Sequence, residues 1–84
     1  MNVVLYGADW CGDCVRSKRF LKEHGIKFVE HNIVTSPERA DEVVQLNIKA
    51  GFGTKRRIPV ILIGEKILSE PSNDDLAEAL GIAA

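Results

Sequence analysis

The sequence VVLYGADWCGDC, residues 3–14, places an apolar run directly in front of two cysteines. Residues 3–6 are apolar and rich in β-branched side chains, which is typical of a strand covered on both faces. We expect residues 7–10 to turn the chain and a helix to follow over residues 11–24. A covered strand that passes directly into a helix predicts an α/β fold.

The next elements follow from helix start and stop signals. Gly25 ends the first helix, because glycine adopts the left-handed conformation that closes helices. Residues 27–33 predict a strand whose imperfect alternation leaves one face partly wet. A second helix is predicted over residues 37–49. Ser36 is expected to cap this helix, and Pro37 stands at its first position, where a missing N–H costs nothing.

The second half of the chain predicts a hairpin and a last helix. Residues 60–63 are a fully apolar strand, Gly64-Glu65 suits a two-residue turn, and residues 66–68 form the returning strand. Residues 72–75 open the last helix with acidic side chains, and Gly81 ends it. The order βαβαββα begins with a right-handed parallel crossover and closes with an antiparallel hairpin. We therefore expect a four-stranded mixed sheet flanked by three helices.

Composition limits the classes of protein to which the chain can belong. Its 84 residues allow a single domain, residues 1–84. Eleven basic and twelve acidic residues give a net charge of −1, which disfavours a nucleic-acid partner. No run approaches the roughly 18 apolar residues of a membrane span, and residues 1–5 lack the features of a signal peptide. These observations predict a soluble cytoplasmic protein, with two cysteines that are too few for a disulfide-stapled secreted scaffold.

The motif Cys11-Gly12-Asp13-Cys14 predicts redox chemistry. Three positions apart in the first helical turn, the two sulfurs lie on one face, close enough for a disulfide. Cys11 meets the unpaired N–H groups and the positive end of the helix dipole, which favour its thiolate, whereas the charge of Asp13 opposes it. Cys14 lies one turn further in and should remain a thiol. We therefore predict that Cys11 attacks a disulfide and that Cys14 resolves the mixed intermediate.

The two cysteines have two other interpretations, as core residues or as metal ligands. Cysteines that only fill the core have no reason to lie where a strand passes into a helix. A metal site would need Cys11, Cys14, His24 and His31, but their spacing does not match a zinc finger. With about 1.5 Å of rise per helical residue, the histidines lie over roughly ten ångströms away. We therefore expect no metal.

Other residues near the motif keep two interpretations each. Ile58-Pro59 precedes an apolar strand, and we expect a cis peptide bond there, with the extended Ile58 backbone free to pair with substrate. The basic residues 55–57 are either a solvated loop or a binding site for the carboxylate of a small thiol. Trp10 either covers one side of the site or anchors its loop on the core. Lys18 is either a solubilising residue or a source of positive potential near the sulfurs.

At these motifs the sequence resembles the glutaredoxin family of the thioredoxin fold, over essentially its whole length. The resemblance rests on the Trp-Cys-Gly-Asp-Cys motif at 10–14, on Ile-Pro-Val at 58–60, and on Ser-Asn-Asp-Asp-Leu at 72–76. Residues 68–72, Leu-Ser-Glu-Pro-Ser, are similar to a stretch of the mycoredoxin-like branch. That branch also carries glycine after the first cysteine and a lysine at the position of Lys18.

The resemblance implies a thioredoxin-like fold and an enzyme, a dithiol thiol-disulfide oxidoreductase. Such an enzyme reduces protein disulfides, or mixed disulfides with a small thiol, and serves electron transport and redox homeostasis in the cytoplasm. Glutathione or mycothiol is the implied cosubstrate, with no tightly bound cofactor, no nucleic-acid or membrane partner, and a monomeric chain. The implied catalytic residues are Cys11 and Cys14, and the implied substrate-binding residues are Trp10, Arg57, Ile58, Pro59, Ser72, Asn73 and Asp74.

Three departures from the family pattern bear on which small thiol serves as cosubstrate. No lysine stands just before the motif, Gly12-Asp13 replaces proline and tyrosine, and Pro71-Ser72 replaces a double glycine before the last helix. Mycothiol, or direct reduction of a protein partner, therefore competes with glutathione. The alternative function is a carrier that holds a [2Fe–2S] cluster between two chains, which Gly12 permits. Most such carriers lack a second cysteine, however, and Cys14 is present.

Overall fold

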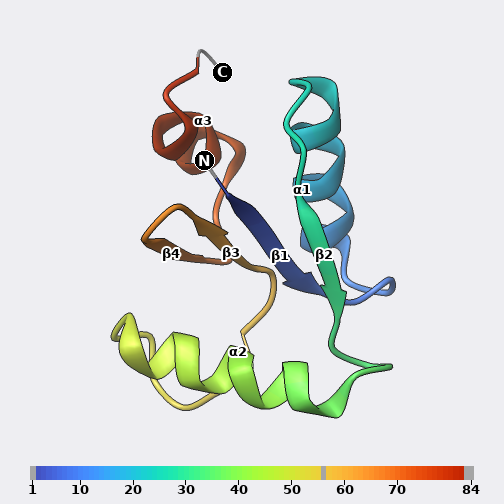
Figure 1. Ribbon diagram of the computed structural model, residues 1–84, viewed down its shortest axis with the longest axis vertical. Coiled ribbons are helices and arrows are strands. Elements are labelled where there is room, and N and C mark those ends of the chain that lie inside the picture. The colour runs from blue at the N-terminus through green and yellow to red at the C-terminus, as the bar shows by residue number, and fades with distance from the viewer. Residues whose placement is uncertain (1, 56, 83–84) are drawn as a thin grey trace.

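The computed structural model describes residues 2–55 and 57–82 and follows the predicted order βαβαββα (Figure 1). The strands stand in the order β2-β1-β3-β4; β1 and β2 are parallel, and the other two pairs are antiparallel. The predicted four-stranded mixed sheet with three helices is therefore confirmed. Its elements are β1 (Val3–Gly7), α1 (Gly12–Glu23), β2 (Val29–Asn32), α2 (Pro37–Lys49), β3 (Val60–Ile63), β4 (Lys66–Ser69) and α3 (Asn73–Leu80).

The helices cover the two faces of the sheet unequally (Figure 1). Leu5 of β1 packs with side chains of α1 and α3 on one face, and the adjacent Tyr6 packs with Val43 of α2 on the other. Successive side chains of a strand point to opposite faces, so β1 contributes to both cores. No helix among the described residues is long and apolar enough to cross a membrane.

Helix ends follow local signals in most places. Gly25 adopts a φ of 68°, and its N–H donates to the Lys22 carbonyl at 3.1 Å, so the predicted end of α1 is confirmed. Gly81 closes α3 in the left-handed conformation, as predicted. Ser36 occupies the N-cap position of α2, but its side chain makes no capping hydrogen bond, so that part of the prediction is wrong. Its backbone carbonyl instead accepts from the Arg39 N–H at 2.9 Å.

The bounds of β1 and β2 differ from the sequence prediction in ways that bear on the site, and β4 runs one residue further than predicted. Gly7 is the last residue of β1 rather than part of the turn, because it pairs with Asn32 in the parallel ladder. The second strand is shorter than the predicted residues 27–33, because its pairing with β1 begins only at Val29. Consequently the last residue of β1, Gly7, lies beside the buried Cys14.

Candidate active site

Cys11 and Cys14 lie where β1 passes into α1, and both are free thiols. Cys11 is the N-cap residue of α1, with extended backbone angles of −86° and 115°, and its Sγ accepts a hydrogen bond from the Cys14 N–H at 3.4 Å. Cys11 therefore lies at the helix N-terminus, as predicted. Cys11 is half-buried, whereas Cys14 has no exposed surface. Only the first sulfur is therefore accessible to a partner.

Cys14 packs directly against the backbone of Gly7. A Cβ added at Gly7 would lie 2.7 Å from Cys14 Sγ and 3.1 Å from Cys14 Cβ. A side chain larger than hydrogen would fit there only if Cys14 or the strand moved, so Gly7 fixes where the second thiol lies. The sequence predicts a turn at Gly7, and this contact was missed. Its signal is a glycine at the end of an apolar strand, which often marks a close backbone approach.

Burial sets the protonation state of the second thiol. Loss of solvent raises the pKa of Cys14 to about 12, with its hydrogen bond to the Cys11 side chain adding to the shift. A backbone hydrogen bond from Ala8 and the charge of Lys18 act in the opposite direction. Cys14 is therefore a protonated thiol at neutral pH, as the sequence predicted, and it becomes a nucleophile only when its proton is removed.

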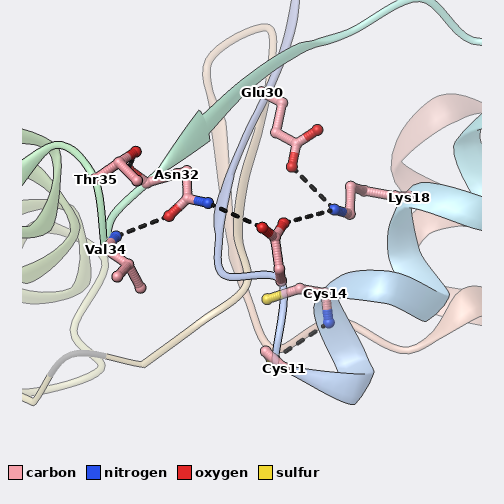
Figure 2. Close-up of polar contacts among 8 residues, drawn as sticks. Cys11, Cys14, Lys18, Glu30, Asn32, Val34 and Thr35 are labelled. Carbon is pink, nitrogen blue, oxygen red and sulfur yellow. Dashed lines mark hydrogen bonds and ion pairs between the residues drawn. The ribbon is translucent and has the colours of Figure 1, made fainter.

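Lys18 is the cation that faces this buried thiol, and a cluster of acidic and amide side chains holds it (Figure 2). Its Nζ donates to Glu30 Oε2 at 2.9 Å and lies 3.9 Å from Asp9 Oδ1. The hydrogen bond to Glu30 raises the pKa of Lys18, so its ammonium stays charged. Only 17% of the Lys18 side chain is exposed, which favours its second interpretation, a source of positive potential near the sulfurs.

Asn32 extends this cluster to the loop between β2 and α2 (Figure 2). Its Nδ2 donates to Asp9 Oδ2 at 3.5 Å, and its Oδ1 accepts from the Val34 N–H at 2.9 Å. The second bond is an Asx turn, which fixes the backbone just after β2. The cluster thus connects the segment before Cys11 with the β2–α2 loop.

The loop before β3 carries the predicted proline. The Ile58–Pro59 peptide bond is cis, as predicted, and Pro59 is buried. The Pro59 carbonyl accepts from the Glu70 N–H at 2.8 Å. Asn47 of α2 anchors the same loop, because its Nδ2 donates to the Arg57 carbonyl at 3.2 Å. Neither Asn47 nor Glu70 was singled out from the sequence, because their partners come from other elements.

The structure ties Arg57 to its own chain. Its Nε donates to the Phe52 carbonyl at 3.3 Å, and its Nη1 lies 3.8 Å from Glu70 Oε2. Arg56, the middle residue of the predicted basic loop, lies outside the described residues. The part of this loop that the structure describes therefore presents an arginine already paired with a carboxylate.

The start of α3 approaches the motif through Arg16. This side chain donates to Asn73 Oδ1 at 2.6 Å and to the Pro71 carbonyl at 2.8 Å, which links α1 to α3. Ser72 and Asp75 form a capping box that occupies two N–H groups of the helix end. A shallow depression of about 380 Å³ lies here, lined by Asp13, Arg16, Glu70, Ser72, Asn73 and Asp74.

Trp10, the residue before Cys11, lines a second depression. We call it the Trp10 groove; its volume is about 550 Å³, and it also contains Ile58. Trp10 is 74% exposed, so it borders the site rather than anchoring its loop on the core. The groove is lined by Trp10, Ile33, Val34, Pro37, Ala40, Asp41 and Ile58.

The histidines take no part in this site. His24 packs against Phe20, with ring centroids 4.3 Å apart, and His31 packs against Tyr6 at 5.1 Å. Within residues 2–55 and 57–82, no three His, Cys, Asp or Glu side chains gather closely enough to hold a metal ion.

Comparison with known proteins points to one family. The family model described as Glutaredoxin matches residues 3–68. A glutaredoxin of Pseudomonas aeruginosa is 38% identical over 63 residues, which cover 75% of this chain and 68% of that protein. The global transcriptional regulator Spx of Lactiplantibacillus plantarum is 36% identical over 56 residues, 67% of this chain. That match spans only 42% of the regulator's length.

Solved structures agree with this comparison. The crystal structure of a glutaredoxin from Archaeoglobus fulgidus superposes with a TM-score of 0.76 and 26% sequence identity. The superposition covers 94% of this chain and 85% of the archaeal one.

Proposed function

Because this chain belongs to the glutaredoxin family, we propose that it is a dithiol thiol-disulfide oxidoreductase acting through Cys11 and Cys14. Its substrates would be protein disulfides or mixed disulfides with a low-molecular-weight thiol. The observation that carries the proposal is the unequal placement of the two sulfurs: Cys11 is reachable at the helix N-terminus, and Cys14 is a buried thiol beside it. We further propose that the chain works as a monomer in the cytoplasm, in electron transport and redox homeostasis.

The reaction proceeds by two exchanges. The Cys11 thiolate attacks one sulfur of the substrate disulfide, which forms a Cys11–substrate disulfide and releases the other sulfur as a thiolate. Cys14 then loses its proton and attacks Cys11 Sγ, forming the Cys11–Cys14 disulfide and releasing the second substrate thiolate. Two electrons pass from the dithiol to the substrate. Two equivalents of a reducing thiol, with glutathione and mycothiol as the candidates, return the protein to its dithiol form.

Residues around the motif have proposed binding roles. The backbone of Ile58, next to the buried Pro59, would pair with an extended substrate, and Trp10 would border it. Arg57 and the start of α3 would contact the carboxylates of a small thiol. The substrate-binding set proposed for this site is Trp10, Arg57, Ile58, Pro59, Ser72, Asn73 and Asp74.

The test uses one serine variant of each cysteine. Cys11→Ser should reduce the rate of disulfide reduction to the uncatalysed background, because it removes the attacking sulfur. Cys14→Ser, mixed with oxidised glutathione or oxidised mycothiol, should accumulate an adduct on Cys11 whose mass names the accepted thiol. Activity that survives in Cys11→Ser and disappears in Cys14→Ser would reverse the assigned roles.

The alternative proposal is a [2Fe–2S] carrier. Cys11 is only partly buried, and the glycine that follows it carries no side chain, which supports Cys11 as the ligand on one side of a cluster. Cys14, fully buried, is not available as a further ligand, so a second chain and two small thiols would have to complete the site. Protein purified without oxygen distinguishes the two: iron–sulfur absorption supports the carrier, and a colourless protein supports the oxidoreductase.

A further inference from the structure

Glu70, between β4 and α3, has a backbone conformation that its residue type disfavours. Its φ is 50°, in the left-handed region that residues with a Cβ adopt rarely. Every other residue with a positive φ in the described part of the chain is a glycine. A glutamate at a position that suits glycine points to a role for its side chain.

The side chain of Glu70 meets the loop that carries the cis-proline. The Glu70 N–H donates to the Pro59 carbonyl at 2.8 Å, which places Glu70 beside the residue that follows Ile58. Its Oε2 lies 3.8 Å from Nη1 of Arg57. The side chains of Arg57 and Glu70 are 43% and 47% exposed, so water and salt weaken this ion pair. A carboxylate on a substrate can therefore compete with Glu70 for Arg57.

Glu70 also adds charge to the shallow depression of about 380 Å³ at the start of α3, which we call the α3 depression. Asp13, from the cysteine motif, and Asp74 line the same depression, and all three carboxylates are exposed. The depression therefore adjoins the motif. A substrate carboxylate that enters it meets charges of its own sign, which disfavours binding.

Two arginines near the α3 depression differ in how firmly they are held. Arg16 donates to Asn73 Oδ1 at 2.6 Å and to the Pro71 carbonyl at 2.8 Å, so its guanidinium group is committed to joining α1 and α3. Arg57 is held through Nε, at 3.3 Å from a carbonyl oxygen of its own loop, and through the longer ion pair with Glu70. Arg57 is therefore the arginine that can turn to a substrate, and Glu70 competes for it.

We propose that Glu70 is a specificity-determining residue that disfavours the disulfides of small thiols bearing carboxylates. Its carboxylate occupies Arg57, so a substrate carboxylate reaches the arginine only by displacing Glu70. Neutral and cationic disulfides have no carboxylate to place and escape this competition. The inference rests on the proposed function and sets the substrate preference of that same site.

The experiment compares three small disulfides of similar size and different charge: dianionic dithiodipropionate, neutral hydroxyethyl disulfide and dicationic cystamine. The reduced protein is mixed with each at neutral pH and low ionic strength. The readout is the rate constant for release of the first thiol, and each charged disulfide is expressed as a ratio to hydroxyethyl disulfide.

Glu70→Gln removes the charge and keeps the length of the side chain and the demand on the backbone. We expect the dithiodipropionate ratio to rise about threefold, the range of a single exposed ion pair, and the cystamine ratio to fall. Both changes should shrink as salt is added. Oxidised glutathione, a larger disulfide with carboxylates, should gain in the same direction as dithiodipropionate.

A double variant and a matched control assign the effect to Arg57. In Glu70→Gln combined with Arg57→Gln, most of the gain with dithiodipropionate should disappear, because the released arginine is gone. Glu65→Gln removes the same charge from an exposed residue of the β3–β4 turn, at the end of β3 away from Pro59. This control should leave both ratios unchanged.

The outcomes separate this inference from the proposed function. The inference is wrong if Glu70→Gln leaves the dithiodipropionate ratio unchanged, if the gain survives intact in the double variant, or if Glu65→Gln gives an equal gain. Each of these results leaves the oxidoreductase proposal in place. Absence of reaction with all three disulfides would overturn the proposed function itself.

Discussion

The surroundings of Cys11 and Cys14 differ in almost every physical respect, although the two residues are three positions apart. Cys11 caps α1 and accepts a backbone N–H, and its sequence neighbours Trp10 and Asp13 line two separate depressions. Cys14 is sealed against Gly7, and the nearest charged group that favours its thiolate is Lys18. The same side chain therefore acquires two roles from two features of the backbone: a helix end and a glycine in a strand.

The first prediction removes the packing that isolates the Cys14 side. Gly7→Ala places a Cβ 2.7 Å from Cys14 Sγ, which forces the second cysteine or the strand to move. We expect the free energy of unfolding of the reduced protein to fall by about 1–3 kcal/mol, as is usual for overpacked cores. Urea denaturation followed by circular dichroism measures this change.

The matched control is Gly12→Ala, within the same motif. A Cβ at Gly12 meets nothing within 4 Å, and alanine is the better helix former by about 1 kcal/mol. This variant should therefore be as stable as the natural chain or slightly more stable. If both alanine variants lost stability equally, the close contact at Gly7 would not be the cause.

The second prediction uses the protonation of Cys14. Its pKa is about 12 in the fold and 9.0 for an ordinary cysteine, so between these pH values the unfolded chain releases a proton that the folded chain keeps. The protonated Cys14 thiol therefore makes its full contribution to the free energy of unfolding below pH 9. Above pH 9 the free energy of unfolding falls, by about 1.4 kcal/mol per pH unit.

Denaturant unfolding of the reduced protein at pH 8, 9 and 10 measures this decline. Cys14→Ser lacks the titrating group and serves as the reference for all other groups that titrate in the same range. We expect stability to fall more steeply with pH in the natural chain than in this variant. Parallel curves would show that Cys14 titrates normally in the fold.

The third and smallest effect concerns Lys18. Lys18→Met removes the charge that favours the Cys14 thiolate, so the second exchange should slow by about threefold, the range of a single partly exposed charge. Release of the second thiol in a single turnover measures this step, and release of the first thiol reports the attack by Cys11 in the same trace. Lys18→Arg should retain most of the rate, and Lys22→Met, at an exposed lysine of the same helix, should change neither step.

Features set by neighbouring residues could be predicted from the sequence. The helix ends at Gly25 and Gly81 depend on one residue's allowed φ. The thiol state of Cys14 was also predicted, from its distance to the helix start, although burial is its main cause. Ser36 was placed correctly, but its hydroxyl makes no cap. A cap requires one rotamer as well as one position, and the sequence specifies only the position.

Features that join distant segments were missed. Arg57 read as a free basic residue, yet Glu70 of a different segment pairs with it. The sequence leaves two interpretations for Lys18, and the choice between them depends on Glu30 of β2, which accepts a hydrogen bond from its ammonium group. Such pairings depend on the register of the sheet and on helix placement, which a single sequence does not specify.

Gly7 has a consequence for protein engineering. Transplanting Cys-Gly-Asp-Cys into the first turn of another helix would reproduce the spacing of the sulfurs. It would not reproduce the packing of Gly7 that keeps the second sulfur buried. On a scaffold whose preceding strand ends in a larger residue, the second thiol would be pushed toward water and would compete with the first for any incoming disulfide. The smallest portable unit of this redox centre is therefore the eight-residue segment 7–14, with its glycine included.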